Sequence, residues 1–477
     1  MITEIGNELD TIDLGDKRLN GRSKRLLDKL FADPAASINS ACRGWAETQA
    51  AYRFFDNNAV QQKKILAPHE DATRARIAEH PVVLIAQDTT ELDFSDHPPT
   101  GAGPLNSKKQ RGFLDHSQIA FTPNGLCLGV VNVKIWARSD EGFGTAKQRQ
   151  YDPLETKEKY RWLEGYRHAC ELQQQVLETQ IVSVADCECD IYELFVEVDK
   201  QGEAAVDYVI RGGKTRCLPE LDPESGPSTY RKLQQEMNEA PLITVRQLDL
   251  PRTPKRDARE VTLEVRAKRV RLKPPYRKHT TLPEVEINVV LVREINPPSD
   301  DEAVEWLLIT TLPISTVEEV LLIVDYYTGR WPIEVFFRVY KTGCQVEQIQ
   351  LETSARLLPC LMLYKIIAWR VLYLTMLGRH CPELPCDVLF TADEWKPVWK
   401  ITSKEPIPEI APPLSTFLLL LAQLGGHNGR TKDGPPGPQS IWVGIRRMTD
   451  FAMAWRAFGP DHNSPLPNNE ENRDTCV

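Results

Sequence analysis

Apolar residues recur at two different periods along this chain. Up to residue 68 their spacing is helical, and segment 45–55 carries aromatic side chains at that spacing. From Val82 onward, short apolar runs typical of β-strands take over, interrupted by one helical segment at 155–180. These runs cover residues 82–88, 118–121, 126–136 and 181–186. We therefore expect a small helical domain, residues 1–68, followed by an α/β domain.

The second half of the chain repeats the change from strands to helices. Further β-like runs lie between residues 205 and 311, at 208–211, 242–250, 261–272, 285–295 and 305–311. Helical spacing resumes at Thr316, and the later helical segments are 357–377, 414–425 and 441–458. Prolines between 382 and 413 predict a linker, and the polar residues 461–477 are typical of a disordered tail.

One helical stretch combines an acidic side chain with side chains that suit phosphate. Tyr327 and Arg330 lie seven and four residues before Glu334, and Lys341 lies seven residues after it. At helical spacing all four share one face within about 60°. This arrangement suggests phosphodiester chemistry, and the alternative is an ordinary surface helix with its charges opposite a buried apolar stripe.

Pro332 lies inside this stretch and cannot continue a helix without losing a hydrogen bond. We therefore expect two abutting helices, the second beginning near Pro332 as its first residue and carrying Glu334 and Lys341.

Two predicted strands end in an aspartate. Asp88 follows the first apolar run and Asp186 follows the fourth, so the two carboxylates converge if these strands are neighbours. An aspartate after a strand is also a common cap of a turn or helix. Asp190 and Glu188 compete with Asp186 and rank lower, because Asp190 should lie beyond the strand end.

Near the N-terminus, Asp16 is the expected cap of a basic helix. Arg18, Arg22 and Arg25 follow at i, i+4 and i+7 on one face, with leucines on the other. Such a face suits a DNA backbone, although a merely solvated basic face has the same pattern.

Charge is unevenly distributed. The chain has a formal net charge of -9, which argues against indiscriminate binding of nucleic acid by the whole surface. Residues 251–280 nevertheless contain eleven Lys and Arg against three Asp and Glu, a local net charge of +8. This asymmetry predicts an anion-binding face there.

Cysteine usage and hydropathy bear on the compartment. Eleven cysteines without a paired framework, and no leader pattern in residues 1–10, predict reduced thiols in the cytoplasm. Cys187 and Cys189 have no further ligands at zinc-site spacing. The apolar run 360–378 contains Lys365 and Arg370, so we expect a core helix with snorkelling charges and no membrane span.

The order of these elements and three motifs carry a resemblance. The motifs are Gln87-Asp-Thr-Thr90, Val184-Ala-Asp-Cys-Glu-Cys-Asp-Ile-Tyr192 and Tyr327-x2-Arg330-x3-Glu334-x6-Lys341. Together they resemble the DDE cut-and-paste transposases of bacterial insertion sequences, of the Tn-five type within the IS-four group. Supporting matches are at residues 14–18, 51–54, 111–117, 293–298 and 424–426, and at Trp442.

The resemblance implies an α/β fold with three parts. A ribonuclease-H-like catalytic core, residues 69–375, would contain an inserted β-rich subdomain at about 205–311. An all-α DNA-end-binding domain, residues 1–68, would precede it, and an α-helical dimerisation domain, residues 376–477, would follow. The location implied is the bacterial cytoplasm, at the nucleoid when the protein is bound to DNA.

The resemblance also implies roles for individual residues. Asp88, Asp186 and Glu334 would be the catalytic and metal-binding acids. They would hold two Mg²⁺ ions, for which Mn²⁺ can substitute, and carboxylate oxygens suit such hard cations. Trp306 would receive a flipped base, and its alternative is a buried strand tryptophan. Phosphate binding would fall to Arg211, Tyr327, Arg330 and Lys341, and DNA-end binding to Arg18, Arg22, Arg25 and Arg53.

The expected function is therefore transposition by a synaptic homodimer on double-stranded DNA. The protein would bind inverted-repeat ends, excise the element by metal-dependent nicking and hairpin formation, and join the 3′-hydroxyl ends to target DNA. Pro332 departs from the family pattern, which has a basic residue at this position. Two alternatives remain: an inactive DNA-binding regulator or inhibitor derived from a transposase, and a stand-alone nuclease, which would not need the dimer-like C-terminus.

Overall fold

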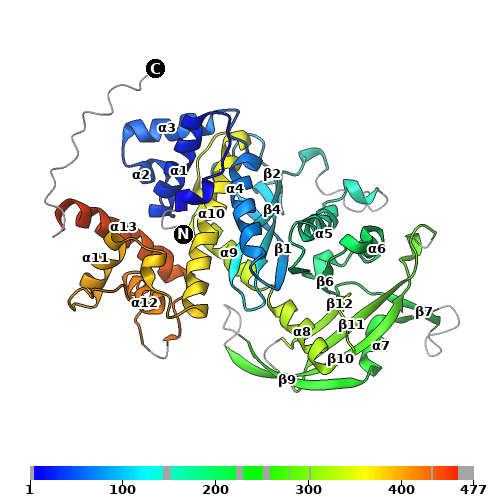
Figure 1. Ribbon diagram of the computed structural model, residues 1–477. Helices are drawn as coiled ribbons and strands as arrows, with labels where there is room; N and C mark the ends of the chain where they lie inside the picture. Colours follow the sequence, from blue (N-terminus) through cyan, green and yellow to red (C-terminus); the bar gives the residue numbers. More distant parts are fainter. Residues whose placement is uncertain are drawn as a thin grey trace. The chain divides into compact units, whose positions relative to one another are not determined.

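The computed structural model describes residues 5–142, 152–221, 229–250, 258–278, 280–299, 302–430 and 433–459. The chain forms two compact units, one of Met1–Pro68 with Arg338–Val477 and one of His69–Phe337. Figure 1 labels most of the helices and strands of both. Residues 251–257 of the predicted basic face and the predicted tail 461–477 lie outside the described residues.

A ten-stranded mixed sheet is the centre of unit 69–337 (Figure 1). Its strand order is β2-β3-β1-β5-β6-β12-β11-β10-β9, with β4 also paired to β3. The strands are β1 (Val82–Asp93), β2 (Gly103–Pro104), β3 (Arg111–Phe121), β4 (Cys127–Trp136), β5 (Gln180–Ala185), β6 (Asp207–Arg211), β9 (Leu242–Leu250), β10 (Arg259–Leu272), β11 (Val285–Glu294) and β12 (Glu305–Thr310). A separate pair consists of β7 (Cys217–Leu221) and β8 (Tyr230–Lys232). The strands predicted from the apolar runs are thereby confirmed.

The predicted β-rich insertion shares the sheet of the preceding strands. β6 runs parallel to β5, and β12 returns antiparallel to β6, so the later strands extend the same sheet. Local sequence predicts these strands, but their partners depend on long-range register. The sequence therefore located the insertion without showing that it continues the first sheet.

The helices of this unit are α5 (Tyr160–Gln173), α6 (Tyr192–Gln201), α7 (Leu233–Glu239) and α8 (Val317–Thr328), followed by α9 (Pro332–Arg338), which ends at the division between units. α5 is shorter than the predicted helix 155–180, because a separate 3₁₀ turn precedes it and β5 begins at Gln180. α7 lies inside the region predicted as β-rich. α9 begins at Pro332, as predicted.

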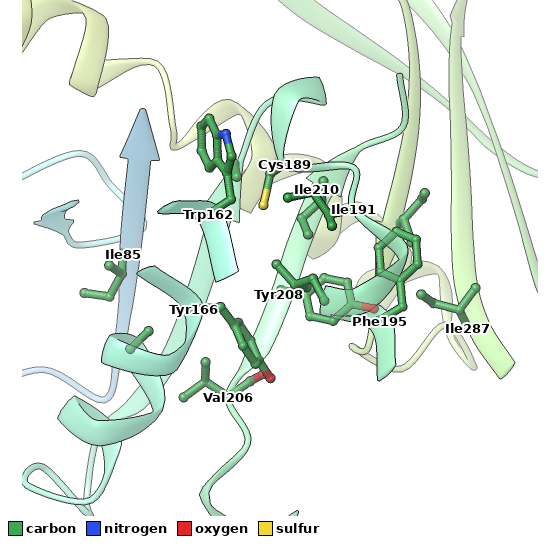
Figure 2. Close-up of a cluster of buried hydrophobic side chains, with 14 of the residues drawn as sticks. Ile85, Trp162, Tyr166, Cys189, Ile191, Phe195, Val206, Tyr208, Ile210 and Ile287 are labelled. Carbon is green, nitrogen blue, oxygen red and sulfur yellow. The ribbon is translucent and has the colours of Figure 1, made fainter. Parts of the chain in front are cut away.

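Alternate residues of the central strands enter two different cores. Val83 and Ile85 of β1 belong to a cluster with side chains of α5 and α6, part of which is shown in Figure 2. Leu84 belongs to a second cluster, which contains residues of α8. Because successive side chains of a strand point to opposite faces, the sheet is covered by α5 and α6 on one face and by α8 on the other. β5, with Ile181–Ala185 entirely buried, shows the continuous apolar run of a strand covered on both sides.

The other unit is helical in its described residues. It contains α1 (Lys17–Ala32), α2 (Ile38–Cys42), α3 (Trp45–Phe55), the start of α4 (Gln62–Ile77), α10 (Ser354–His380), α11 (Ala392–Thr402), α12 (Leu414–Leu424) and α13 (Pro438–Phe458). The expected cap of α1 is confirmed, because the Arg18 backbone N–H donates to Asp16 Oδ1 at 2.7 Å. α11 corrects the predicted proline linker. Thr391 and Glu394 form a capping box there, and Trp395 is buried beneath it.

α10 runs through the predicted domain boundary at residues 375–376 without interruption. It is the one helix in the described part of the chain that is long and apolar enough to cross a membrane, and 89% of its most apolar window is buried. Lys365 and Arg370 are themselves buried, which corrects the expectation that they snorkel to solvent. The Lys365 ammonium lies 4.4 Å from the centre of the Tyr340 ring, an arrangement that partly compensates a buried cation.

Candidate active site

Parallel pairing sets the two candidate aspartates level with each other. β1 pairs with β5 so that Ala86 lies opposite Val184. Asp88 and Asp186 each follow two residues later, on the face covered by α8. β5 ends before Asp186, whereas β1 continues to Asp93 because β3 pairs with it beyond that point. Asp88 is thus inside a strand, which corrects the expected strand end, and the strands are neighbours as the hypothesis required.

The next strand adds a basic residue to the same row. β6 pairs with β5 so that Ile210 lies opposite Ala185, which sets Arg211 level with Asp186. The Arg211 guanidinium donates to Cys187 Sγ at 3.5 Å. Burial works against the charged form of Arg211, but Tyr327, Cys187 and Asp186 outweigh it and raise the pKa of Arg211. Asp88, Asp186 and Arg211 therefore lie level with one another, in this order, at the adjacent strands β1, β5 and β6.

The end of α8 brings a second basic residue onto this row. Gly329 follows α8, and a Cβ at this position would lie 2.6 Å from the Leu84 side chain of β1. The absence of a side chain lets the helix end approach the strand closely. Arg330 then lies against Asp88, with its Nη1 donating to Asp88 Oδ2 at 3.0 Å.

Arg330 links the first and third predicted acids. Its Nη2 donates to Glu334 Oε1 at 2.8 Å, an i,i+4 contact between two residues that the spacing placed on one face. The Arg330 side chain is only 8% exposed, that of Asp88 20%, and that of Glu334 61%. Asp88, Asp186 and Glu334 line one cavity of about 470 Å³ together with Arg211, Tyr327 and Trp306. The structure thus brings the three predicted acids into one site.

The acids influence one another electrostatically. Burial raises the pKa of Asp88 to about 6; Arg330 and the Thr89 N–H oppose this shift, and the charges of Asp186 and Glu334 add to it. Carboxylate charges that repel one another across a cavity create a place where added positive charge is stabilised.

The donor set therefore fits a hard divalent cation, with Asp88, Asp186 and Glu334 as the residues that would hold it. Among the described residues, however, no three acidic, histidine or cysteine side chains are close enough together to form a metal site as they stand. Arg330 occupies the position between Asp88 and Glu334, so metal binding would require this side chain to move.

Trp306 lies on β12 on the same face of the sheet and is 8% exposed. Its ring centre lies 5.3 Å from that of Tyr327 and 6.0 Å from that of Trp331. It packs in the core, as the alternative of a buried strand tryptophan predicts, and it also lines the cavity; its role in receiving a base stays a prediction.

The contacts of Asp190 indicate a role in stabilising the fold. Asp190 is fully buried, forms an ion pair with Arg216, and accepts backbone N–H bonds from Gly213 at 3.0 Å and Lys214 at 2.9 Å. This supports its lower rank beside Asp186. Lys341, predicted with the phosphate-binding residues, belongs to the other unit, in a π-helical turn over Val339–Gly343, where it lies 3.1 Å from Glu347.

Arg161 is one of several basic residues in the predicted helical segment 155–180, and the sequence assigns it no distinct role. In the structure it is buried and bonded to Thr89 and Glu188, next to the two aspartates. No signal in the sequence separates it from Arg167 or its lysine neighbours, because its contacts span 72 and 27 residues.

Family models of known proteins match two regions of the chain, one near each end. Residues 5–60 match the family model described as transposase DNA-binding, and residues 366–458 match that of the transposase Tn5 dimerisation domain. Together the two matches support a Tn5-like transposase. A cryo-EM structure of the piggyBac transposase synaptic complex with hairpin DNA is also similar, at 10% sequence identity and a TM-score of 0.31 over 83% of this chain. The chain spans 59% of the length of that relative.

The predicted DNA-end residues lie within the DNA-binding match. Arg18, Arg25 and Arg53 are exposed. Arg22 is half-buried and forms an ion pair with Glu47 at 2.8 Å, so it is already engaged. The dimerisation match covers most of α10 and all of α11 to α13.

The raised pKa of Asp88 predicts a pH-dependent stability difference. The folded value, about 6, exceeds the ordinary 3.8, so this group favours folding at low pH and loses that contribution as pH rises through 6. Asp88→Asn mimics the neutral acid and should raise the free energy of unfolding at pH 7.5 by roughly 1–3 kcal/mol. Urea unfolding of both proteins in EDTA, at about pH 4, 5, 6 and 7.5, measures this difference in the free energy of unfolding. The gain should vanish near pH 4, and a pH-independent effect would contradict the assignment.

Proposed function

We propose that this chain is a metal-dependent DNA transposase with a ribonuclease-H-like core. It would nick DNA at inverted-repeat ends, release the element through a hairpin intermediate, and join the 3′-hydroxyl ends to target DNA. The observation that carries the proposal is the single cavity lined by Asp88, Asp186 and Glu334 with Arg211 and Arg330. Its row of carboxylates is flanked by fixed positive charge, which suits a phosphodiester held beside metal ligands.

Each residue of the cavity then has a task in this proposal. Asp88, Asp186 and Glu334 would hold Mg²⁺ or Mn²⁺, which when bound activates the attacking oxygen and stabilises the leaving one. Arg211 and Tyr327 would orient a phosphate at the level of Asp186. Arg330 would exchange its two carboxylate contacts for a phosphate oxygen. Its Nε is buried without a hydrogen-bond partner among the described residues, so a phosphate acceptor would improve its bonding.

Trp306 would stack on a base displaced during hairpin formation. The contacts of its ring with Tyr327 and Trp331 hold it rigidly in the cavity wall, which lowers the entropy lost on stacking.

The terminal domains supply the rest of the proposed assembly. The transposase DNA-binding match supports recognition of transposon ends, and the Tn5 dimerisation match supports a homodimer. We propose that two copies pair two ends in a synaptic complex, with Lys341 as an additional phosphate contact.

The direct test uses a DNA fragment that carries the short inverted repeats flanking the chain's own reading frame. With Mg²⁺, the purified protein should produce nicked strands, then hairpins, then strand-transfer products, resolved on denaturing gels. With Ca²⁺ or EDTA it should bind these ends without cutting. Binding with no cleavage in either Mg²⁺ or Mn²⁺ would favour a DNA-binding regulator, for which the Arg330 contacts to Asp88 and Glu334 are the supporting observation.

End binding should depend on Arg18 through its charge. Arg18→Ala removes an exposed guanidinium from α1 and should weaken binding and reduce the salt-dependence slope by about 0.9 for one lost phosphate contact. Lys24→Ala is the control, because Lys24 lies on the same helix but forms an ion pair with Asp10 at 2.7 Å. Fluorescence anisotropy between about 50 and about 300 mM NaCl, roughly a sixfold range, gives both slopes. Equal slopes for wild type and Arg18→Ala would assign Arg18 to the solvated surface.

A further inference from the structure

A buried arginine on α5 joins the two strands that carry the active-site aspartates. Arg161 Nε donates to Thr89 Oγ1 at 2.8 Å, and its Nη2 donates to Glu188 Oε2 at 2.6 Å. Its Nη1 donates to the Glu158 backbone carbonyl at 2.8 Å, which ties the guanidinium to the start of its own helix. One rigid group therefore spans from β1 to the loop after β5.

Both side chains that Arg161 holds belong to residues whose backbone supports an aspartate. The Thr89 backbone N–H donates to Asp88 Oδ1 at 2.7 Å. The Glu188 backbone N–H donates to Asp186 Oδ1 at 2.9 Å. Thr89 and Glu188 are thus fixed at their side chains by Arg161 and fix the two aspartates through their backbones.

The hydrogen bond from Arg161 to Thr89 is the first of a buried chain of hydrogen bonds. A guanidinium can only donate, so the Thr89 hydroxyl accepts from Arg161 and is free to donate to His116 Nδ1, 2.9 Å away. His116 Nε2 then donates to Gln87 Oε1 at 3.3 Å, and Gln87 Nε2 donates to Ser183 Oγ at 3.1 Å. Burial lowers the pKa of His116 well below its usual value, consistent with this neutral tautomer. The chain crosses β3, β1 and β5 and leaves little freedom at Thr89.

The location of Arg161 is energetically demanding. Its guanidinium lies 5.3 Å from the Trp162 ring centre and 5.6 Å from that of Trp136, and burial lowers its pKa. Trp162 belongs to the buried cluster that also contains Cys189 of the loop after β5 (Figure 2). A buried charge is a poor source of stability compared with apolar side chains of similar size. Packing of α5 alone would not need an arginine here.

We propose that Arg161 is a positioning residue that sets the separation and orientation of Asp88 and Asp186 for a divalent cation. The proposal rests on the proposed function, since it assumes that these aspartates bind the metal. Residues that orient metal ligands typically contribute 10- to 100-fold to metal affinity, as an order of magnitude. Arg161 and Thr89 should therefore influence metal affinity without touching the metal.

The test measures Mn²⁺ binding to the full chain by the EPR signal of free Mn²⁺, with and without a duplex carrying its inverted repeat. Sites that disappear in Asp88→Asn define the active-site component. Arg161→Lys keeps the positive charge but loses the planar guanidinium that donates to Thr89 and Glu188 together. It should weaken the Asp88-dependent Mn²⁺ affinity by about tenfold or more. Thr89→Val removes only the hydroxyl and should act in the same direction, whereas Thr89→Ser keeps the hydroxyl and should bind Mn²⁺ like the wild type.

Arg167→Lys is the matched control on the same helix. Arg167 contacts Glu197 and the Tyr160 hydroxyl, away from both aspartates, so this variant should leave Mn²⁺ affinity unchanged. If Arg161→Lys fails to fold, the Thr89 pair decides. Wild-type affinity in Thr89→Val, or an equal loss in Arg167→Lys, would overturn the positioning role while leaving the proposed function standing. Absence of any Asp88-dependent Mn²⁺ binding in the wild type would overturn both.

Discussion

Glu334→Gln should reduce the rate of strand nicking by on the order of 10²–10³-fold, because a lost metal-ligand charge is worth several kcal/mol at about 1.4 kcal/mol per tenfold. The substitution preserves shape, and Glu334 is 61% exposed, so the fold should be unaffected. Binding of end DNA should also be retained. A time course of nicked product with Mg²⁺, beside anisotropy with Ca²⁺, separates cleavage from binding.

Asp325→Asn is the control for this experiment. Asp325 lies on α8, close in sequence to Glu334, but forms an ion pair with Arg246 at 2.5 Å and does not line the cavity. Its nicking rate should match the wild type. Substantial nicking by Glu334→Gln would remove Glu334 from the proposed triad.

Asp190→Ala should have the largest effect on stability. Its removal leaves the Arg216 guanidinium, 7% exposed, without a counter-charge, and it orphans the Gly213 and Lys214 N–H groups. Breaking a buried ion pair in this way costs about 3–5 kcal/mol. At roughly 2–4 °C per kcal/mol for a unit of this size, the melting temperature should fall by about 6–20 °C.

Glu286→Ala is the matched control, because Glu286 pairs with Arg269 and Arg271 on the exposed surface of the same sheet. Its loss should leave the melting temperature close to that of the wild type, because exposed ion pairs are screened by solvent. Calorimetry of both variants, with nicking assayed well below either transition, also tests the rank of Asp190 below Asp186. An Asp190→Ala protein that melts like the wild type but does not nick would make Asp190 the second catalytic acid.

Residues close together in sequence were predicted well. The cap at Asp16, the span of α3 and the helix start at Pro332 all follow from spacing within one or two turns. Local geometry fixes such contacts before any tertiary structure forms. The prediction of a linker over α11 was wrong, because the capping box at Thr391 and Glu394 begins a helix between the prolines.

The candidate site was predictable as a set of residues but not as an arrangement. The motifs singled out Asp88, Asp186 and Glu334, and the condition that their strands be neighbours could be stated but not tested. Pairing of β1 with β5 satisfied it, and this register joins residues about 100 positions apart. A slip of one residue in the pairing of β1 with β5 would turn one of the two aspartates to the opposite face of the sheet.

The amino-acid sequence by itself determined most of the long strands, several of the helices, the motif spacing and the resemblance to a transposase family, because each depends on residues near one another along the chain. Only the tertiary structure decided that β6 and β12 join the later strands to the first sheet, that Arg330 lies between Asp88 and Glu334, and that Arg161 contacts Thr89 and Glu188. These contacts depend on strand register and on which face of a sheet a helix covers. Many alternatives satisfy the same local pattern, and only packing of the complete chain selects one.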